Sequence, residues 1–313
     1  MIRKSALSMA TLAVIGTLAM AGCSSTDTAK TDAVKTKSDV EAVTQWGGWD
    51  PSPNPLPQLN CTDDSYANAV KNGLTLGLEG AKPYNYMDPA TNKPLGIDVD
   101  IVHTALKYAG ITKLKSVVMP FDSLVPSLQG KKIDVINANI HVTEPRLKQL
   151  QFSSPGWWYG PQMVVRKGDE SRITSYDDLL KSNITVATVG GSINQTYLEA
   201  VKAPNITIFK DKNTELAAVT NGSVDVALED PVTMGEYIKD NPNSNLVLVD
   251  APIPQEIITE YGYGYARYGF RLADCSLNAA FSRALSEIRD NGVVLRILKT
   301  YGLGESNVTI PGQ

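Results

Sequence analysis

Short apolar runs alternate with amphipathic segments along most of the chain, between residues 74 and 301. The first run, Leu74-Thr-Leu-Gly-Leu78, is followed by turn residues and predicts a strand. Residues 96–109 then place Ile97, Ile101 and Ala105 at helical spacing. Strands that alternate with helices predict an α/β fold with largely parallel sheets. At 313 residues and 42% hydrophobic residues, the chain has material for one or two domains.

The same pattern continues to the end of the chain. It predicts further strands at residues 116–119, 134–140, 162–166, 184–189, 206–209, 224–228, 246–249 and 263–267. Helices are predicted at residues 124–130, 175–181, 192–201, 214–220, 231–238, 277–290 and 293–301.

An internal repeat indicates two similar units. Gly130-Lys-Lys-Ile-Asp-Val135 and Gly222-Ser-Val-Asp-Val226 each place a helix-ending glycine shortly before a strand that begins with Asp-Val. Both strands run into polar residues, which are Asn139, His141, Thr143 and Arg146 in the first unit and Glu229 and Asp230 in the second. Ligands of open α/β sheets bind beyond the carboxyl ends of the strands. We therefore expect two lobes that face one cleft.

The N-terminus has the features of an export signal. Arg3 and Lys4 precede an apolar stretch at residues 6–21, which is shorter than the roughly 20 residues of a spanning helix. Met20-Ala21-Gly22-Cys23 resembles the bacterial lipobox, whose cysteine is lipidated. We expect a signal peptide at 1–22, lipidation of Cys23, and a polar tether at 23–60. The protein would then be anchored to the cell membrane, facing the periplasm or exterior. Ordinary cleavage near Ala21 would instead release a soluble protein.

Cysteine parity points to one disulfide. Lipidation of Cys23 leaves Cys61 and Cys275, and exported proteins fold in an oxidising compartment. We predict a Cys61–Cys275 bond; two unpaired buried thiols are the alternative.

Composition argues against several classes of function. A net charge of −4 disfavours nucleic-acid binding. The two histidines, His103 and His141, and the cysteines lack the spacing of a zinc site, so we expect no metal and no cofactor.

From about Leu74 to Leu303 the chain resembles the extracellular solute-binding proteins of family 3, which serve ABC importers of amino acids and related compounds. The matching stretches are Lys82-Pro-Tyr-Asn-Tyr86, Gly96-Ile-Asp-Val-Asp100, Phe121-Asp-Ser-Leu-Val-Pro-Ser-Leu128, Lys132-Ile-Asp-Val135, Thr143-Glu-Pro-Arg146, Phe152-Ser-Ser-Pro155, Gly191-Ser192, Leu228-Glu-Asp230, Asn291-Gly-Val and Ile297-Leu-Lys-Thr-Tyr-Gly302. Tyr84-Asn-Tyr86 and residues 121–129 are most similar to ectoine-binding members.

The resemblance implies a two-lobed periplasmic-binding-protein fold of type II. Its two crossover strands would be residues 162–166 and 263–267. Lobe 1 would comprise residues 61–163 and 265–313, and lobe 2 residues 164–264. The implied function is capture of an amino acid, opine or ectoine-like zwitterion by hinge closure, for an ABC permease. We expect a monomer.

Two charged residues carry the expected chemistry. The planar guanidinium of Arg146 can grip a carboxylate through two bonds, and the matching family arginine holds the α-carboxylate of the ligand. Asp230 follows an apolar strand and is the expected partner of a ligand cation. It precedes Pro231, so a helix N-cap is an equally strong interpretation, and both roles are compatible. Glu229 is expected to point away.

Eight further residues are candidates for the binding site. Thr143, Asn139 and His141 correspond to ligand-contacting positions, although His141 is equally well a packed neutral histidine. Gly191 and Ser192 open a helix whose free amides can receive an anion. Phe121 and Tyr84 are candidate walls, and core packing is at least as good an explanation of Tyr84. Glu79 is placed to meet a positive group of the ligand; a solvated loop carboxylate is the alternative.

Two other functions fit the same fold. A periplasmic dehydratase would need a general acid such as Glu79, Asp230 or His141, but no acid–base pair is identifiable. A sensor would report the ligand to a membrane kinase. We expect no catalytic residue.

Overall fold

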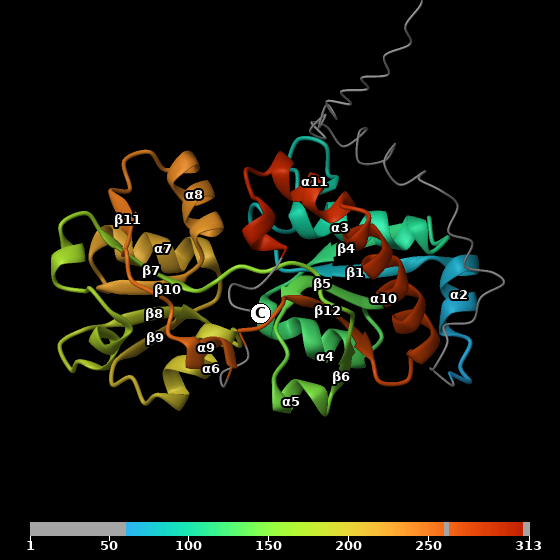
Figure 1. Cartoon of the computed structure of the whole chain (residues 1–313), viewed down its shortest axis with the longest axis horizontal. Helices are drawn as coiled ribbons and strands as arrows, with labels where there is room; N and C mark the ends of the chain where they lie inside the picture. Colours follow the sequence, from blue (N-terminus) through green and yellow to red (C-terminus); the bar gives the residue numbers. More distant parts are fainter. Residues whose placement is uncertain (1–60, 260–262, 309–313) are drawn as a thin grey trace, which may run out of the picture. The chain divides into compact units, whose positions relative to one another are not determined.

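The computed structural model describes residues 61–259 and 263–308. The predicted signal peptide, Cys23 and the tether lie outside the described residues. The described chain contains two five-stranded sheets and one two-stranded sheet (Figure 1). Within it, no helix has the length and apolar character needed to cross a bilayer.

The first sheet has the strand order β4-β1-β5-β12-β6 (Figure 1). Its strands are β1 (Leu74–Leu78), β4 (Leu114–Val118), β5 (Val135–Ile140), β6 (Leu150–Phe152) and β12 (Arg267–Arg271). Strand β1 is parallel to β4 and β5, whereas β12 is antiparallel to β5 and β6. A strand from late in the sequence is therefore inserted between two early ones.

Helices cover both faces of this sheet. The larger core lies under α2 (Ser65–Asn72), α3 (Ile97–Tyr108), α10 (Cys275–Asp290) and α11 (Val293–Thr300). The other face packs on η1 (Phe121–Ser123) and α4 (Leu124–Gln129). Short elements complete this part: β2 (Tyr86–Met87), β3 (Pro94–Leu95), α5 (Glu144–Leu147) and η4 (Glu305–Asn307). We call this sheet with its helices lobe 1.

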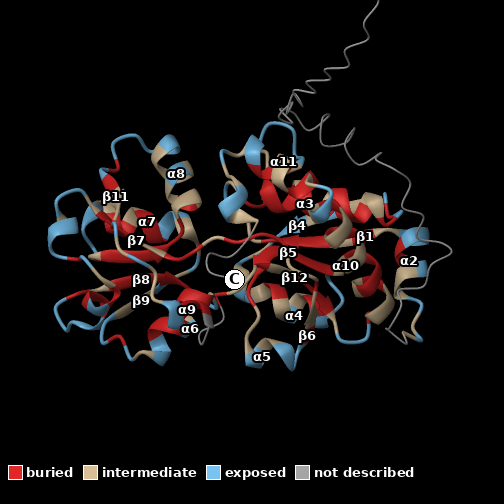
Figure 2. Cartoon of the chain, in the orientation of Figure 1, coloured by how far each residue is buried: buried red, intermediate tan, exposed pale blue. Residues whose placement is uncertain are grey.

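The second sheet has the order β11-β7-β10-β8-β9, with β7 (Gln162–Arg166), β8 (Val186–Val189), β9 (Ile206–Phe209), β10 (Val226–Glu229) and β11 (Leu246–Leu248). One face packs on η3 (Tyr176–Leu180), α6 (Ile193–Ala200) and α9 (Gln255–Thr259), and the other on α7 (Lys212–Asn221) and α8 (Pro231–Asp240). We call this part, with η2 (Asp169–Ser171), lobe 2. In both lobes the strands are largely buried between the helix layers (Figure 2).

Strand β12 in the first sheet and strand β7 in the second are each antiparallel to the other four strands of their sheet. The prediction of largely parallel sheets is therefore confirmed. Strands β1, β7 and β9 have their predicted bounds, and most other elements shift by one or two residues.

The internal repeat has the same structural role in both lobes. The Asp134 carboxylate accepts a hydrogen bond from the Thr75 amide at 2.9 Å, and the Asp225 carboxylate accepts one from the Thr185 amide at 2.8 Å. Each aspartate thus ties the start of its own strand to the chain at the start of the neighbouring one. The aspartate of the repeated Asp-Val pair therefore links neighbouring strands in both lobes.

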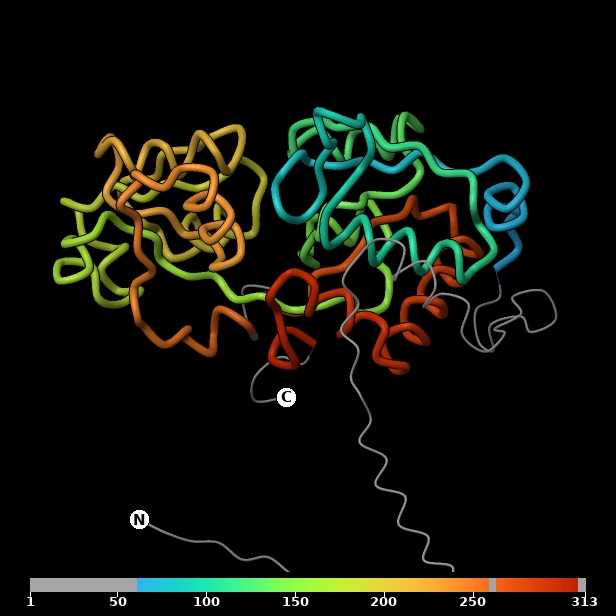
Figure 3. The backbone as a smooth tube through the Cα atoms, turned by 90° about the horizontal axis from the view of Figure 1, so that it is seen from above, coloured from blue at the N-terminus to red at the C-terminus, as the bar shows by residue number. Residues whose placement is uncertain are grey.

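Two connections lead between the sheets. The first, residues 153–161, follows β6 and enters β7, and the second includes residues 263–266 and enters β12 (Figure 3). The prediction of a second crossover strand at 263–267 is wrong, because β12 begins only at Arg267. Tyr263 is buried against the lobe 2 core, so its aromatic character serves packing rather than strand pairing. Strand β7, which begins at Gln162, belongs to the second sheet. The bounds of the two lobes stay a prediction.

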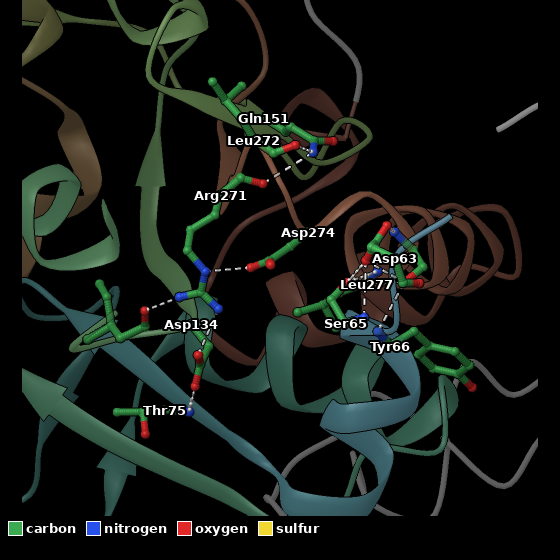
Figure 4. Close-up of polar contacts among 12 residues, drawn as sticks. Asp63, Ser65, Tyr66, Thr75, Asp134, Gln151, Arg271, Leu272, Asp274 and Leu277 are labelled. Carbon is green, nitrogen blue, oxygen red and sulfur yellow. Dashed lines mark hydrogen bonds and ion pairs between the residues drawn. The ribbon is translucent and has the colours of Figure 1, made fainter. Parts of the chain in front are cut away.

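The start of the described chain is joined to the start of α10 by a covalent bond and by polar contacts. Cys61 and Cys275 form a disulfide, as predicted from parity. Beside it, the Asp63 carboxylate accepts hydrogen bonds from the amides of Ser65 and Ser276, both at 3.0 Å. Figure 4 shows Asp63 and Ser65 of this region together with Arg271, which pairs with Asp134 and Asp274.

Candidate functional site

Two neighbouring cavities are lined by residues from both lobes. The inner cavity, of about 40 Å³, is lined among others by Glu79, Phe121, Asn139, His141 and Arg146 of lobe 1, by Ser192, Asn194, Lys212, Glu229 and Asp230 of lobe 2, and by Tyr159 and Tyr263. The outer cavity, of about 460 Å³, shares Glu79, Phe121, Val189 and Lys212 with it. Seven predicted residues therefore meet at the inner cavity. Tyr84, Thr143 and Gly191 do not line it but contact residues that do.

Arg146 spans the two lobes. Helix α5 begins after Thr143, whose hydroxyl accepts a hydrogen bond from the Arg146 amide at 3.4 Å. The guanidinium donates to the His141 carbonyl at 2.7 Å and to the Gly191 carbonyl of lobe 2 at 2.6 Å. It also lies over the Phe121 ring, 5.5 Å from its centroid.

The charge of Arg146 has no carboxylate partner among the described residues. Burial lowers the pKa of Arg146 to about 10, so the side chain remains protonated at neutral pH. A half-buried cation that is held only by carbonyl oxygens favours an anionic ligand, since an unpaired charge that is partly removed from water is costly.

Asp230 is the N-cap of α8. Its Oδ1 accepts hydrogen bonds from the amides of Val232 and Thr233 at 2.9 and 2.8 Å and from the Tyr84 hydroxyl of lobe 1. Burial alone would raise the pKa of Asp230, but Lys212 and these hydrogen bonds hold it below its usual value. The helix-capping interpretation is therefore confirmed, while contact with a ligand stays a prediction.

Lys212, the first residue of α7, is the main residue that sequence reasoning missed. Its ammonium contacts Glu229 Oε2 at 3.0 Å, Asp230 Oδ2 at 3.4 Å and the Thr233 hydroxyl at 3.3 Å. It also lies 4.8 Å from the centroid of the Tyr84 ring. Burial acts to lower the pKa of Lys212, but the surrounding carboxylates outweigh it and raise the pKa well above its usual value.

The expectation that Glu229 points away is wrong. Glu229 and Asp230 are 3% and 2% exposed and face the same lysine, because β10 ends at Glu229 and the chain turns into α8. Burial raises the pKa of Glu229 to about 8. Two consecutive acids that become buried require a cation beside them. The pair Glu229-Asp230 at the end of a predicted strand was therefore the sequence signal for a nearby lysine such as Lys212.

Glu79 follows β1 and stands at the boundary of the two cavities. Its amide donates to Asn85, but its carboxylate has no hydrogen-bond or ion-pair partner within the described chain. Burial raises the pKa of Glu79, and Lys212 opposes that rise.

Asn139 and His141 lie at the end of β5. Asn139 has a positive φ of 50°, and both polar atoms of its buried amide lack a partner among the described residues. An unsatisfied buried amide facing a cavity is well placed to bind a ligand. The His141 ring packs between Tyr159 and Tyr263, with centroids 5.4 Å away in each case. Burial lowers the pKa of His141 to about 3, which favours the packed neutral form.

Gly191 and Ser192 precede α6. The Gly191 amide donates to Gln195 at 2.7 Å, and the Ser192 hydroxyl caps the helix by accepting from the Gln195 amide at 3.1 Å. Gln195 therefore already occupies the Gly191 amide, and the expectation that the free amides of α6 receive an anion stays a prediction. Tyr84 lines neither cavity and packs in the core of lobe 1, where it stacks on Trp157 with centroids 5.7 Å apart.

Comparison with known proteins gives a consistent result. Residues 74–304 match the family described as bacterial extracellular solute-binding proteins, family 3. The chain is 26% identical over 251 residues to the lysine/arginine/ornithine-binding periplasmic protein of Escherichia coli K12, covering 79% of this chain and 93% of the relative. It is 28% identical over 221 residues to a probable histidine-binding protein of Neisseria gonorrhoeae, covering 70% and 78%.

A solved structure agrees with the fold. An ancestral arginine-binding protein bound to arginine superposes with a TM-score of 0.64 at 27% identity, covering 73% of this chain and 97% of the other.

Proposed function

Because this chain belongs to the bacterial extracellular solute-binding proteins of family 3, we propose that it captures an amino acid or a related small zwitterion for import through an ABC permease. The relatives above are named for binding amino acids, which supports this ligand class. They are binding proteins rather than enzymes, so the proposal is capture and not catalysis. The single observation that carries the ligand class is Arg146, a cation in the inner cavity with no carboxylate partner in the described chain.

The size of the inner cavity fits one end of such a ligand. A water-sized group needs roughly 10–15 Å³ of this kind of volume. The 40 Å³ around Arg146 therefore holds about three non-hydrogen atoms, the size of a carboxylate group. The rest of the ligand would extend past Glu79 and Phe121 into the outer cavity.

The proposed mechanism is closure of the two lobes about residues 153–161 and 263–266. Arg146 of lobe 1 and Gly191 of lobe 2 are already in contact, so a carboxylate on Arg146 would lie between the lobes. A ligand favours the closed form only through contacts that the open form lacks.

The test is calorimetric titration with the twenty amino acids, opines and ectoine. Arg146→Met should weaken the best ligand about 100-fold, because it removes a charged hydrogen-bond partner of a buried carboxylate. Lys148→Met, which removes an exposed charge two residues away, is the matched control and should bind normally. Unchanged affinity in the Arg146 variant would contradict the proposal.

Anchoring through Cys23 is a second part of the proposal. It rests on the lipobox-like Met20-Ala21-Gly22-Cys23. Cys23→Ala should release the protein from the membrane fraction and remove the mass of the lipid from the N-terminal peptide. Membrane association that survives this substitution would exclude the lipid anchor.

A further inference from the structure

The acceptors around Lys212 form a complete site for an ammonium group. Glu229, Asp230 and Thr233 each offer one oxygen, at 3.0, 3.4 and 3.3 Å from the Lys212 nitrogen. A primary ammonium has three N–H donors. All three are therefore matched by oxygen atoms from lobe 2.

Asp230 has no acceptor capacity left in this arrangement. Its two oxygens receive five donors, which come from Tyr84, Val232, Lys212 and, twice, from Thr233. A carboxylate offers about four lone-pair sites. A ligand ammonium would have to displace one of the chain's own donors to reach Asp230.

Glu79 is in the opposite situation. It lines the same inner cavity, yet its carboxylate has no hydrogen-bond or ion-pair partner among the described residues. Glu79 is half-buried, and a carboxylate that is partly removed from water and has no partner favours a cation beside it. Among the acids of this cavity, Glu79 is the one with neither oxygen engaged in the described chain, whereas Glu229 has Oε2 and Asp230 has both oxygens occupied.

We propose that the Lys212 ammonium occupies the site formed by Glu229, Asp230 and Thr233. The cationic group of the solute is then bound by Glu79. This inference rests on the proposed function. It makes Lys212 a specificity-determining residue, because it moves the recognition of the ligand cation from lobe 2 to lobe 1. The solute is then held through its carboxylate at Arg146 and through its cation at Glu79.

The test compares ligands that differ only in the ammonium group. The probes are L-arginine with argininic acid, L-histidine with imidazolelactate, and L-leucine with 2-hydroxyisocaproate. In each pair a hydroxyl replaces the α-ammonium. The measured quantity is the ratio of the two dissociation constants, determined by calorimetry for the wild type, Glu79→Gln and Lys212→Gln.

The wild-type ratio should favour the amino acid by about tenfold or more, as for a charged hydrogen bond. Glu79→Gln should reduce the ratio to near one, since Glu79 receives the ammonium. Lys212→Gln should raise the ratio by about tenfold, because Asp230 becomes available as a second acceptor. Lys202→Gln, at an exposed lysine, is the matched control and should keep the wild-type ratio.

An unchanged ratio in Glu79→Gln, or a ratio in Lys212→Gln that does not rise, overturns the inference while amino-acid binding itself stands. Failure of the wild type and Lys212→Gln to bind any probe overturns the proposed function together with the inference. If Lys212→Gln does not fold, Lys212→Gln with Asp230→Asn removes both charges of the pair. This double variant should retain the wild-type dependence on Glu79, and loss of that dependence would contradict the inference.

Discussion

The Tyr84 hydroxyl of lobe 1 donates a hydrogen bond to Asp230 of lobe 2, joining two residues 146 positions apart in the sequence. Both side chains are almost fully buried, at 1% and 2% exposure. The same contact removes one acceptor site from Asp230 and links the lobes without a ligand.

Tyr84→Phe removes this hydrogen bond and keeps the ring that stacks on Trp157. We expect the free energy of unfolding to fall by about 1.5–3 kcal/mol, the usual contribution of a hydrogen bond to a charged group. Urea unfolding measures the change. Tyr263→Phe is the control, because the buried Tyr263 hydroxyl has no partner in the described chain, and it should be neutral or slightly stabilising. Equal effects of the two substitutions would contradict the assignment.

Arg271 at the end of β12 joins its own segment to the chain just before β5. Its guanidinium contacts Asp134 at 2.9 Å, Asp274 at 2.7 Å and the Ile133 carbonyl at 2.7 Å (Figure 4). Arg271→Met should lower the free energy of unfolding by roughly 2 kcal/mol, because two partly buried carboxylates lose their partner.

The comparison for Arg271 is the exposed pair Lys82–Asp240, whose side chains are 44% and 49% exposed. Lys82→Met should change the free energy of unfolding by less than about 1 kcal/mol, since water screens such pairs. Thermal and urea unfolding of the two variants side by side check the contrast. A larger loss for Lys82→Met than for Arg271→Met would refute it.

Asp98 gives lobe 1 a pH-dependent stability. Burial raises the pKa of Asp98 to about 7, although hydrogen bonds from Trp157, Asn85 and Tyr268 oppose the rise. Between the unfolded pKa near 3.8 and the folded pKa near 7, the folded state holds a proton that the unfolded state has lost. The contribution of Asp98 to stability is therefore complete below pH 4 and is lost as the pH rises to 7.

At 1.36 kcal/mol per pKa unit, this loss is roughly 4 kcal/mol at most. Asp98→Asn cannot titrate, so the difference in unfolding free energy between variant and wild type should change steeply from pH 4 to pH 7. Urea unfolding across that range measures it. Parallel pH profiles for the two proteins would rule out Asp98 as the titrating group.

The Cys61–Cys275 disulfide spans 214 positions. A bond that closes so long a loop restricts the unfolded chain, and removal of such a bond typically costs about 2–4 kcal/mol. The double variant Cys61→Ser/Cys275→Ser should unfold at correspondingly lower urea concentration. Dithiothreitol should lower the stability of the wild type to that of the double variant and leave the variant itself unaffected. Insensitivity of the wild type to reduction would contradict this role.

Local patterns were sufficient to predict most of the fold. The apolar run at Leu74–Leu78 and the alternation within Gln162–Arg166 gave the bounds of β1 and β7. The short β6 and the polar α2 were missed, because each is stabilised by partners distant in sequence. Strand β6 pairs with β12, and α2 packs on α10.

The position of a side chain at the inner cavity was predictable where it carried a distinctive charge shortly after a strand, as for Arg146 and Asp230. It was not predictable where the chemistry depended on distant neighbours. Lys212 looks like an ordinary first residue of a helix, and its partners Glu229 and Asp230 lie across the end of another strand. The occupied amide of Gly191 was hidden for the same reason, since it depends on how the Gln195 side chain folds back.

The position of β12 between β5 and β6 sets an order of events for a chain that emerges from a translocation channel with its N-terminus first. Strand β6 pairs only with β12 in the first sheet, so it cannot join that sheet until residues 267–271 have emerged. Cys61 likewise waits for Cys275. The lobe whose synthesis begins first is thus completed last, and most of the chain must pass through the channel before its fold can close.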